Sequence, residues 1–191
     1  MPPLTPTEAK RIQEIMDDPV KWAQVFVRIF DPVQKKVVPW VARWYQAEML
    51  HDQSLKKVAR CGRRTGKTET MCLDSLWRTA KNRNYRCLFI TPYENQVRLI
   101  FRRLQEIING SPMLKKEVVK MTNNPYQIVF KNDSAIMGFT TGASSGNGGA
   151  SIRGQRSDYI YIDECDYLGD GDFDTVTTIA AERNDIGIFI S

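Results

Sequence analysis

The fold class of this chain can be inferred from one segment, Cys61-Gly-Arg-Arg-Thr-Gly-Lys-Thr68. It follows a predicted strand over 55–60 and leads into a predicted helix over 66–80. A phosphate-binding loop needs backbone N–H groups turned inward, a helix N-terminus directed at the anion, a lysine for the β- and γ-phosphates and a hydroxyl for Mg²⁺. Gly66, Lys67 and Thr68 supply the last three residues of the pattern GxxxxGK[ST].

The same segment departs from the usual pattern in two ways. Cys61 stands where the first glycine is expected, and Arg63 and Arg64 stand where most such loops have small residues. A strand-to-helix turn that only required a glycine is therefore the alternative to a phosphate site. The two arginines are either solvated or, in the case of Arg63, able to reach the γ-phosphate and stabilise charge in the transition state.

A second candidate element is an apolar run that ends in two carboxylates, Tyr159-Ile-Tyr-Ile-Asp163-Glu164. In phosphoryl-transfer sites an acid at a strand end holds Mg²⁺, and a neighbouring carboxylate orients or deprotonates the attacking water. A solvated strand end explains many such pairs when they occur alone. When such a pair follows a phosphate loop in the sequence, it predicts Asp163 as the metal-side acid and Glu164 as the general base.

Two further segments could complete a nucleotide site. Trp44-Tyr45-Gln46 precedes the loop, and a glutamine amide matches the N6/N7 edge of adenine while an aromatic ring can stack on the base. Arg153 and Arg156 lead into the carboxylate strand. They belong either to a solvated loop or to an arginine finger, acting on this subunit's phosphate or on a neighbour's.

Predicted strands and helices alternate after residue 55. Strands are expected over 87–91, 127–130, 135–139, 159–162 and 187–191, and a helix over 95–108 with Val97, Ile100, Phe101, Leu104 and Ile108 at helical spacing. This alternation predicts an α/β fold with a mostly parallel sheet covered on both faces. Before it, helices are expected over 5–16, from residue 19 with Trp22, Val25, Phe26 and Ile29 on one face, and over 46–50.

Composition excludes several classes of protein. The 191 residues are 42% hydrophobic and 26% charged, which is typical of a globular protein. No apolar run is long enough to span a membrane, and no signal peptide precedes the first helix. The four cysteines lack metal-ligand spacing and His51 is the only histidine, so zinc sites and histidine triads lack their residues. Free buried thiols and a cytoplasmic protein are expected.

The net charge of +5 is unevenly distributed along the chain. Residues 158–185 hold nine acidic residues and one basic residue, whereas residues 1–157 carry a net charge of +13. Such a basic part can follow a nucleic-acid backbone, although most of its side chains are expected simply to be solvated.

The order of these motifs resembles the ATPase domain of the large terminase subunit of tailed bacteriophages, which packages viral DNA into preformed capsids. The resemblance covers about residues 35–191 and rests on Gln46, the 61–68 loop, Phe89-Ile-Thr-Pro92, Ser151-Ile-Arg-Gly-Gln-Arg-Ser-Asp158 and Tyr161-Ile-Asp-Glu164. Its most specific feature is the loop with a replaced first glycine and an arginine four residues before the lysine. The resemblance implies a three-layer P-loop NTPase fold of the ASCE/RecA-like type, with a helical N-terminal extension over residues 1–50 and the ATPase core over 51–191.

The resemblance also implies roles for individual residues. Glu164 corresponds to the catalytic base, Lys67 and Arg63 stabilise charge on the phosphates, and Arg153 is presented to a neighbouring subunit's ATP, with Arg156 as its competitor. Thr68 and Asp163 hold Mg²⁺. The residues expected to contact ATP are Gln46, Cys61, Gly62, Arg63, Arg64, Thr65, Gly66, Lys67 and Thr68.

The implied partners follow from the family. They are double-stranded DNA, other copies of the chain in a ring (a pentamer when assembled, a monomer when isolated), the portal protein and the small terminase subunit, in the host cytoplasm and without a membrane. The loop over 140–149 is a candidate for gripping DNA. The family's nuclease domain is expected to be absent from this chain, and Asp166, Asp170, Asp172 and Asp174 are expected to form a solvated loop rather than a nuclease site.

Two alternatives remain open at this point. Asp163-Glu-Cys-Asp166 matches a variant of the DEAD box, and a glutamine precedes the loop, as in helicases of superfamily 2. Against a helicase, Arg63-Arg-Thr65 stands where those enzymes carry small residues. The other alternative is a nucleotide-dependent DNA-binding module with weak or lost catalysis.

Overall fold

The computed structural model describes residues 5–52, 54, 56–141, 156–180 and 186–190. Its main feature is a seven-stranded mixed sheet with the strand order β3-β9-β8-β4-β7-β6-β5. Strands β3, β9, β8, β4 and β7 pair in parallel, and β6 and β5 continue the sheet in antiparallel pairs. The strands are β3 Lys56–Arg60, β4 Arg86–Thr91, β5 Val118–Asn123, β6 Tyr126–Phe130, β7 Ala135–Thr140, β8 Tyr159–Asp163 and β9 Ile186–Ile190.

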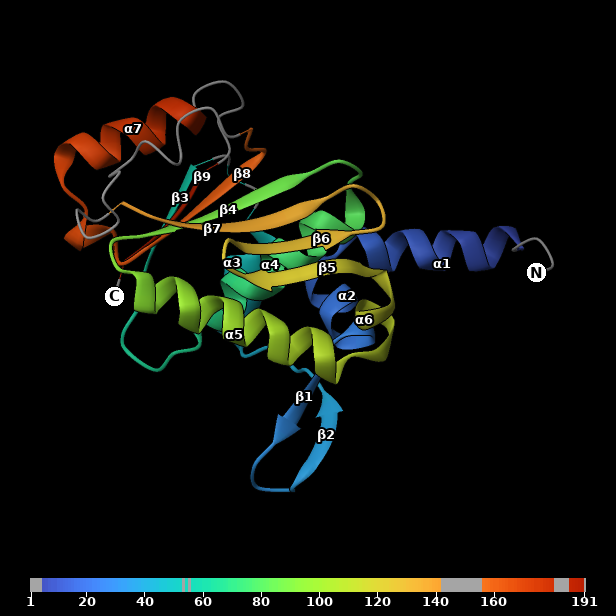
Figure 1. The fold of residues 1–191 in the computed structure, drawn as a ribbon. Coiled ribbons are helices and arrows are strands. Elements are labelled where there is room, and N and C mark those ends of the chain that lie inside the picture. Colours follow the sequence, from blue (N-terminus) through green and yellow to red (C-terminus); the bar gives the residue numbers. More distant parts are fainter. Residues whose placement is uncertain (1–4, 53, 55, 142–155, 181–185, 191) are drawn as a thin grey trace.

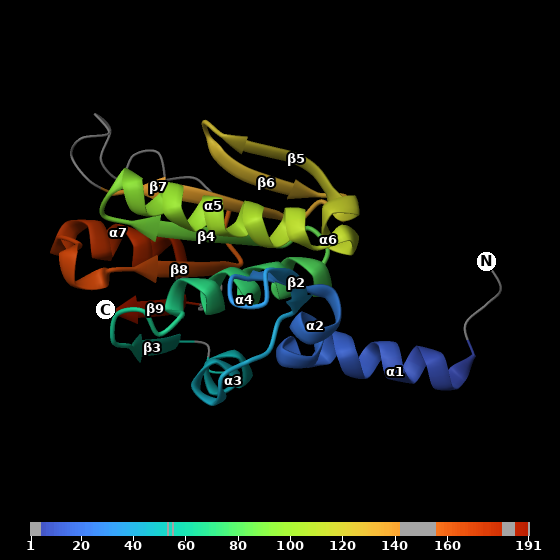
Figure 2. The ribbon, with the colours of Figure 1, turned by 90° about the horizontal axis from the view of Figure 1, so that it is seen from below.

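Helices cover both faces of this sheet (Figures 1 and 2). On one face, α4 (Lys67–Lys81) and α5 (Glu94–Gly110) enclose the larger core together with Phe89 and Tyr161. On the other face, α7 (Asp170–Ala180) adds Val176 to a smaller core. Successive residues of a strand point to opposite faces, so each central strand contributes to both cores. The expected α/β class is therefore confirmed.

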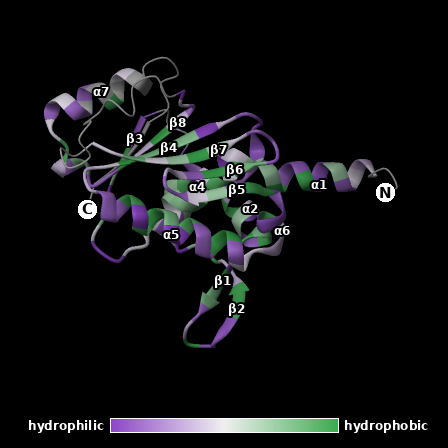
Figure 3. Ribbon diagram, viewed as in Figure 1, coloured by the Kyte–Doolittle hydropathy of each residue, from purple (hydrophilic) through white to green (hydrophobic). Residues whose placement is uncertain are grey.

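Helix α5 buries the apolar residues that the sequence predicted at helical spacing. Its buried side chains are those at helical spacing, and Figure 3 shows hydrophilic and hydrophobic residues alternating along it, as in an amphipathic helix. Helix α4 differs, because ten of its side chains are buried, polar ones among them. The helix that follows the phosphate loop is thus embedded between the sheet and the N-terminal segments.

The N-terminal part consists of α1 (Pro6–Asp17), α2 (Pro19–Phe26), the β1 (Arg28–Asp31) and β2 (Lys36–Pro39) hairpin, and α3 (Trp44–His51). Thr5 and Glu8 form a capping box that starts α1 where the sequence predicted a helix. In Figure 1, α1 extends away from the sheet and the hairpin projects below it. Helix α2 and Trp40 join the larger core, so this part packs directly on α4.

Two N-terminal expectations are wrong. The second helix ends at Phe26, and Ile29 pairs with Val38 in the hairpin instead of extending a helical face. Val25 is 41% exposed and does not belong to the buried face. The hairpin was not predicted because its strands are only four residues long and its turn contains no glycine; Lys35 supplies the positive φ of 49°. Helix α6 (Pro112–Glu117) and strand β5 were also not predicted.

The expectation that the acidic residues after the carboxylate strand lie in a loop is wrong for three of them, although Asp170 and Asp174 are exposed as expected. Asp170, Asp172 and Asp174 lie in α7, and the first two occupy its first turn. Acidic side chains are favoured there by the partial positive charge of a helix N-terminus. Gly169 and Gly171, which are unfavourable in helices, hid this helix from a prediction based on apolar periodicity. Asp166 lies in the short 3-10 helix Cys165–Tyr167 and is exposed.

The cysteines are free, and two of them match the expected buried thiols. Burial raises the pKa of both Cys72 and Cys87. Cys61 and Cys165 are only partly buried. Across the described ranges, no helix is both long and apolar enough to cross a membrane.

Candidate nucleotide-binding site

The segment 61–66 turns between β3 and α4 at the carboxyl end of the parallel strands. Gly66 is the N-cap of α4 with φ 86° and ψ 19°, a left-handed conformation that glycine adopts without steric cost. Arg64 also has a positive φ, of 62°. The hydroxyl of Thr65 donates to the carbonyl oxygen of Gly62 at 2.9 Å and closes the turn. The first turn of α4, with its partial positive charge, is therefore directed at the space above the loop.

Lys67 and Asp163 meet at the cavity that this loop lines. Lys67 Nζ lies 3.0 Å from Asp163 Oδ1, and the two side chains are only 9% and 8% exposed. Burial raises the pKa of Asp163, and the nearby Lys67 ammonium opposes this shift. The ammonium is buried and, apart from this ion pair, has no well-aligned hydrogen-bond acceptor among the described residues. It therefore retains protons to donate to an anion.

Glu164 begins the segment after β8 in an unusual backbone conformation. Its φ of 59° and ψ of 45° are left-handed, which is uncommon for a residue other than glycine. Its N–H donates to Asp163 Oδ1 at 3.1 Å. Backbone strain of this kind concentrates at functional sites, where the surrounding structure holds it in place.

These residues line one cavity of about 360 Å³. The residues at its surface are Gly62, Arg63, Arg64, Thr65, Gly66, Lys67, Thr68, Asp163 and Glu164. All the predicted phosphate and metal residues except Cys61 are thus brought together. A buried ammonium with free protons, a helix N-terminus and a carboxylate pair fit a triphosphate bound with Mg²⁺. Because Mg²⁺ usually keeps several waters and takes one or two protein oxygens, the hydroxyl of Thr68 and the carboxylate of Asp163 fit the requirements of such an ion.

Gln46 lies under the loop. The residue is only 3% exposed, and its Oε1 accepts a hydrogen bond from the N–H of Arg43 at 3.1 Å. A Cβ built on Gly66 would lie 2.7 Å from Gln46 Nε2. Gln46 therefore packs against the helix cap, and its reading of adenine stays a prediction.

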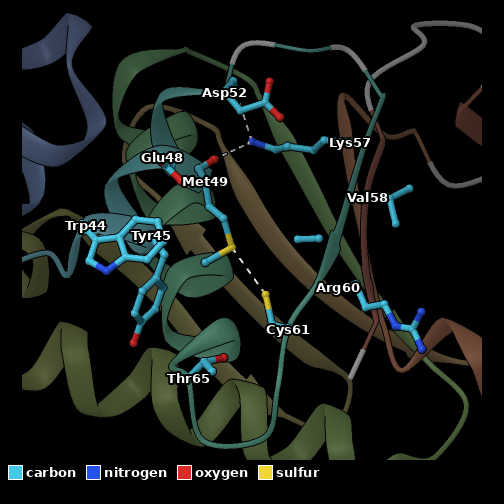
Figure 4. A pocket seen from close by; sticks show the side chains of 11 residues that line it. Trp44, Tyr45, Glu48, Met49, Asp52, Lys57, Val58, Arg60, Cys61 and Thr65 are labelled. Carbon is cyan, nitrogen blue, oxygen red and sulfur yellow. Dashed lines mark hydrogen bonds between the residues drawn. The ribbon is translucent and has the colours of Figure 1, made fainter.

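A second pocket of about 490 Å³ lies beside the loop, between α3 and β3 (Figure 4). The neighbours of Gln46, Trp44 and Tyr45, line one wall, and Cys61 lies opposite with its Sγ 3.9 Å from the sulfur of Met49. Thr65 borders both this pocket and the phosphate cavity. The two cavities therefore adjoin at Thr65.

A polar contact that the sequence did not reveal holds the first turn of α4. Glu69 accepts a hydrogen bond from Trp40 Nε1 at 2.6 Å and forms an ion pair with Arg103 of α5. Glu69 directly follows the phosphate-loop motif, but nothing in the sequence indicates its partners. The contact ties the N-terminal segment and α5 to the start of α4.

The predicted finger residues are placed only in part. Arg153 and most of the 140–149 loop lie outside the described residues. Arg156 is exposed and its Nη2 lies 3.7 Å from Asp158 Oδ1, just before β8 begins. Asp158 and Asp163 are separated by the length of β8, about 16 Å at the usual rise per residue. Arg156 therefore lies at the edge of the sheet opposite its own phosphate cavity.

The acidic residues beyond Glu164 do not assemble a metal centre within the described part of the chain. No group of three or more histidine, cysteine, aspartate or glutamate side chains there is arranged to hold an ion.

Solved structures share this fold. The large terminase of bacteriophage HK97 matches with a TM-score of 0.72 and 16% identity, over 92% of this chain and 37% of that one. The large terminase of a thermophilic bacteriophage, in complex with ADP, matches with a TM-score of 0.55 and 15% identity, over 77% of this chain and 37% of that one. The UvsW helicase of bacteriophage T4 matches with a TM-score of 0.58 and 12% identity, over 94% of this chain and 60% of that one.

At these identities the likeness establishes the fold alone, and the chain spans little more than a third of the two terminases. The comparison with curated proteins gives no match. A family model decides the identity, because the model "Terminase large subunit, T4likevirus-type, N-terminal" matches residues 59–191. That range begins at the end of β3 and contains the phosphate loop, the carboxylate strand and the cavity between them. The chain therefore belongs to the family of terminase large subunits.

Proposed function

We propose that this chain hydrolyses ATP as the motor domain of a viral DNA-packaging terminase and translocates double-stranded DNA into a procapsid. The observation that carries the proposal is the meeting of Lys67, Asp163 and Glu164 at one cavity below the N-terminus of α4. The ADP complex of the thermophilic bacteriophage terminase supports nucleotide binding by this fold. The finer assignment to ASCE/RecA-like P-loop NTPases is supported by the position of β9 between β3 and β8.

The proposed mechanism assigns a task to each residue of the cavity. Backbone N–H groups of the loop and the Lys67 ammonium bind the phosphates, while Arg63 reaches the γ-phosphate from the exposed side. Thr68 and Asp163 hold Mg²⁺, which when bound neutralises charge that develops on the phosphates. Glu164 accepts a proton from water in line with the γ-phosphate. The adenine ring of ATP lies in the pocket lined by Trp44 and Tyr45, and Gln46 lies beside the loop.

The remaining parts of the proposal concern the assembled motor. An arginine from the next subunit, Arg153 or Arg156, completes the charge stabilisation, so the isolated chain turns over slowly. A ring of copies at the procapsid portal, in the host cytoplasm, couples turnover to DNA movement, with the portal protein and small subunit as partners. No nuclease activity is expected from this chain.

Replacing Glu164 by glutamine tests the proposed base. Glu164→Gln should bind ATP with parental affinity and lose roughly 10²–10⁴-fold in turnover, because the amide cannot accept a proton. Lys67→Ala should lose binding as well. Turnover is measured as phosphate release with Mg²⁺ and DNA at high protein concentration, and binding with a fluorescent ATP analogue.

The matched control for Glu164 is Asp166→Asn, which changes an exposed acid two residues away and should leave turnover unchanged. Hydrolysis by Glu164→Gln at the parental rate would show that Glu164 is not the base. A parent chain without Mg²⁺-dependent turnover at any concentration would instead favour an inert nucleotide-dependent DNA-binding module.

A helicase core remains the second candidate, because the UvsW helicase has the same fold. The two functions differ in what happens to the DNA. A packaging motor displaces a bound triplex strand while it moves along intact duplex, whereas a helicase separates the strands of a forked duplex. The family match over residues 59–191 favours the motor.

A further inference from the structure

Helix α4 and strand β8 meet along a row of polar side chains on the buried face of the sheet. Positions 67, 74 and 78 share one face of α4, and positions 163, 161 and 159 alternate along the facing side of β8. The row ends at the candidate nucleotide site with the ion pair between Lys67 and Asp163. At the other end, the guanidinium of Arg78 lies 3.9 Å from the ring centroid of Tyr159.

The middle contact of this row is a hydrogen bond in the protein interior. Tyr161 Oη donates to Asp74 Oδ2 at 2.7 Å, and Arg78 Nε donates to the same oxygen at 2.9 Å. Tyr161 is fully buried and Asp74 is 3% exposed. The ring of Phe89 stacks on that of Tyr161, with 4.7 Å between the ring centroids, and fixes its plane. Because a buried polar group that loses its partner is costly, this bond resists any sliding of β8 along α4.

The bond lies close to the candidate catalytic groups on both elements. Asp163 is two residues beyond Tyr161 on β8, and Lys67 is two helical turns before Asp74 on α4. The separation of the Lys67 ammonium from the carboxylates therefore depends on how the strand is seated against the helix. Apolar contacts alone permit small shifts, whereas a short hydrogen bond with fixed partners sets one register.

We propose that Asp74 and Tyr161 are positioning residues, whose hydrogen bond sets the register of β8 against α4 and so holds Asp163 and Glu164 at their working distance from Lys67. The inference rests on the proposed ATPase function of the cavity. It also gives a reason for the polar pair, since well-packed apolar side chains in its place would be at least as stable.

Two tyrosines on the same strand provide a matched test. Tyr161→Phe removes the hydroxyl that bonds Asp74. Tyr159→Phe removes a hydroxyl from an equally buried ring two residues away, and the Oη of Tyr159 has no hydrogen-bond partner within the described structure. The Tyr159 ring that faces Arg78 is kept in both variants.

Tyr161→Phe should lower kcat for ATP by roughly 10-fold while KM changes less than about twofold, because misplacement acts on the reacting groups more than on binding. Tyr159→Phe should leave both constants unchanged. Asp74→Asn, which keeps an acceptor, should retain more turnover than Asp74→Ala. Combining Asp74→Asn with Tyr161→Phe should cost less kcat than the product of the two single losses, because both variants alter the bond between Tyr161 and Asp74, and Asp74→Asn additionally weakens the contact with Arg78.

Amide hydrogen exchange of the 159–164 and 61–68 segments gives a readout that does not depend on turnover. Exchange in both segments should be faster in Tyr161→Phe than in Tyr159→Phe. Equal kcat losses in the two tyrosine variants, or parental kcat and exchange in Tyr161→Phe, would overturn the inference. If the parent hydrolyses no ATP, the proposed function fails, and the exchange comparison still decides whether this bond holds the strand. Should Tyr161→Phe fail to fold, the Asp74→Asn and Asp74→Ala pair carries the test.

Discussion

At the scale of single residues, the site depends on a few unusual backbone conformations. Gly66 and Glu164 both adopt left-handed dihedral angles, one at the N-cap of α4 and the other just after β8. The glycine does so without steric cost, whereas Glu164 requires support from its surroundings. Asp163 supplies part of that support by accepting the N–H of Glu164.

Gly66→Ala tests the conformation of the loop. The new Cβ would disfavour a φ of 86° and lie 2.7 Å from Gln46 Nε2, whose side chain is held by Arg43. We expect a loss of about 1–2 kcal/mol in the free energy of unfolding and weaker ATP binding, measured by urea denaturation and by a fluorescent ATP analogue. In Gly169→Ala the Cβ meets nothing within 4 Å, so stability and binding should be unchanged. Parental ATP binding by Gly66→Ala would contradict the assigned loop geometry.

At the scale of elements, α4 is held at its first turn by segments from two other parts of the chain. Trp40, which precedes α3, and Arg103 of α5 both contact Glu69. The N-terminal part is therefore bonded to the phosphate-loop helix, although the division of domains at residue 50 stays a prediction.

Trp40→Phe tests this link between elements. The indole is 1% exposed and donates to Glu69, so its replacement should lower the free energy of unfolding by about 1–3 kcal/mol. Trp44 lies four residues away and is 74% exposed, so Trp44→Phe should change the stability very little. Chemical denaturation of both variants is the measurement. Equal losses, or none in Trp40→Phe, would mean that the bond does not hold α4.

At the scale of the whole molecule, the candidate site residues are divided between the two ends of the parallel strands. The phosphate loop and the carboxylates lie at the carboxyl edge, as in other open α/β sheets, and Arg156 lies at the opposite edge. Because Arg156 lies at the opposite ends of the strands from the cavity of its own chain, a role for it in catalysis requires a neighbouring copy.

Mixing two variants of the chain shows which arginine acts on the ATP of a neighbouring copy. Arg153→Ala should lose turnover by about 10³-fold or more if it supplies the charge in trans, and Arg156→Ala should keep it. Adding Glu164→Gln, which retains its arginines, should restore part of the activity of Arg153→Ala. Rescue of Arg156→Ala instead would assign the role to that residue. Parental turnover in both variants at every protein concentration would exclude an arginine finger at either position.

Local sequence patterns predict some parts of this chain and not others. The loop, the carboxylate strand and α5 were predicted because each is a local pattern: a glycine at a tight turn, acids after an apolar run, and apolar residues at helical spacing. The β1–β2 hairpin was not predicted because its four-residue strands are too short to show an alternating pattern of apolar residues. Helix α7 was not predicted because it begins with two aspartates on either side of a glycine, and these show no helical spacing of apolar residues. Arg153 lies outside the described residues, so its role stays a prediction.

Neighbouring residues alone encode β3, the turn after it and α4, and also the strand that ends in Asp163, so these elements follow from local sequence. The folded structure alone shows how these elements are combined. It placed β9 between β3 and β8, Gln46 against Gly66, and Tyr161 against Asp74. These contacts join residues far apart in the chain and depend on strand order and on helix packing, which no local pattern encodes.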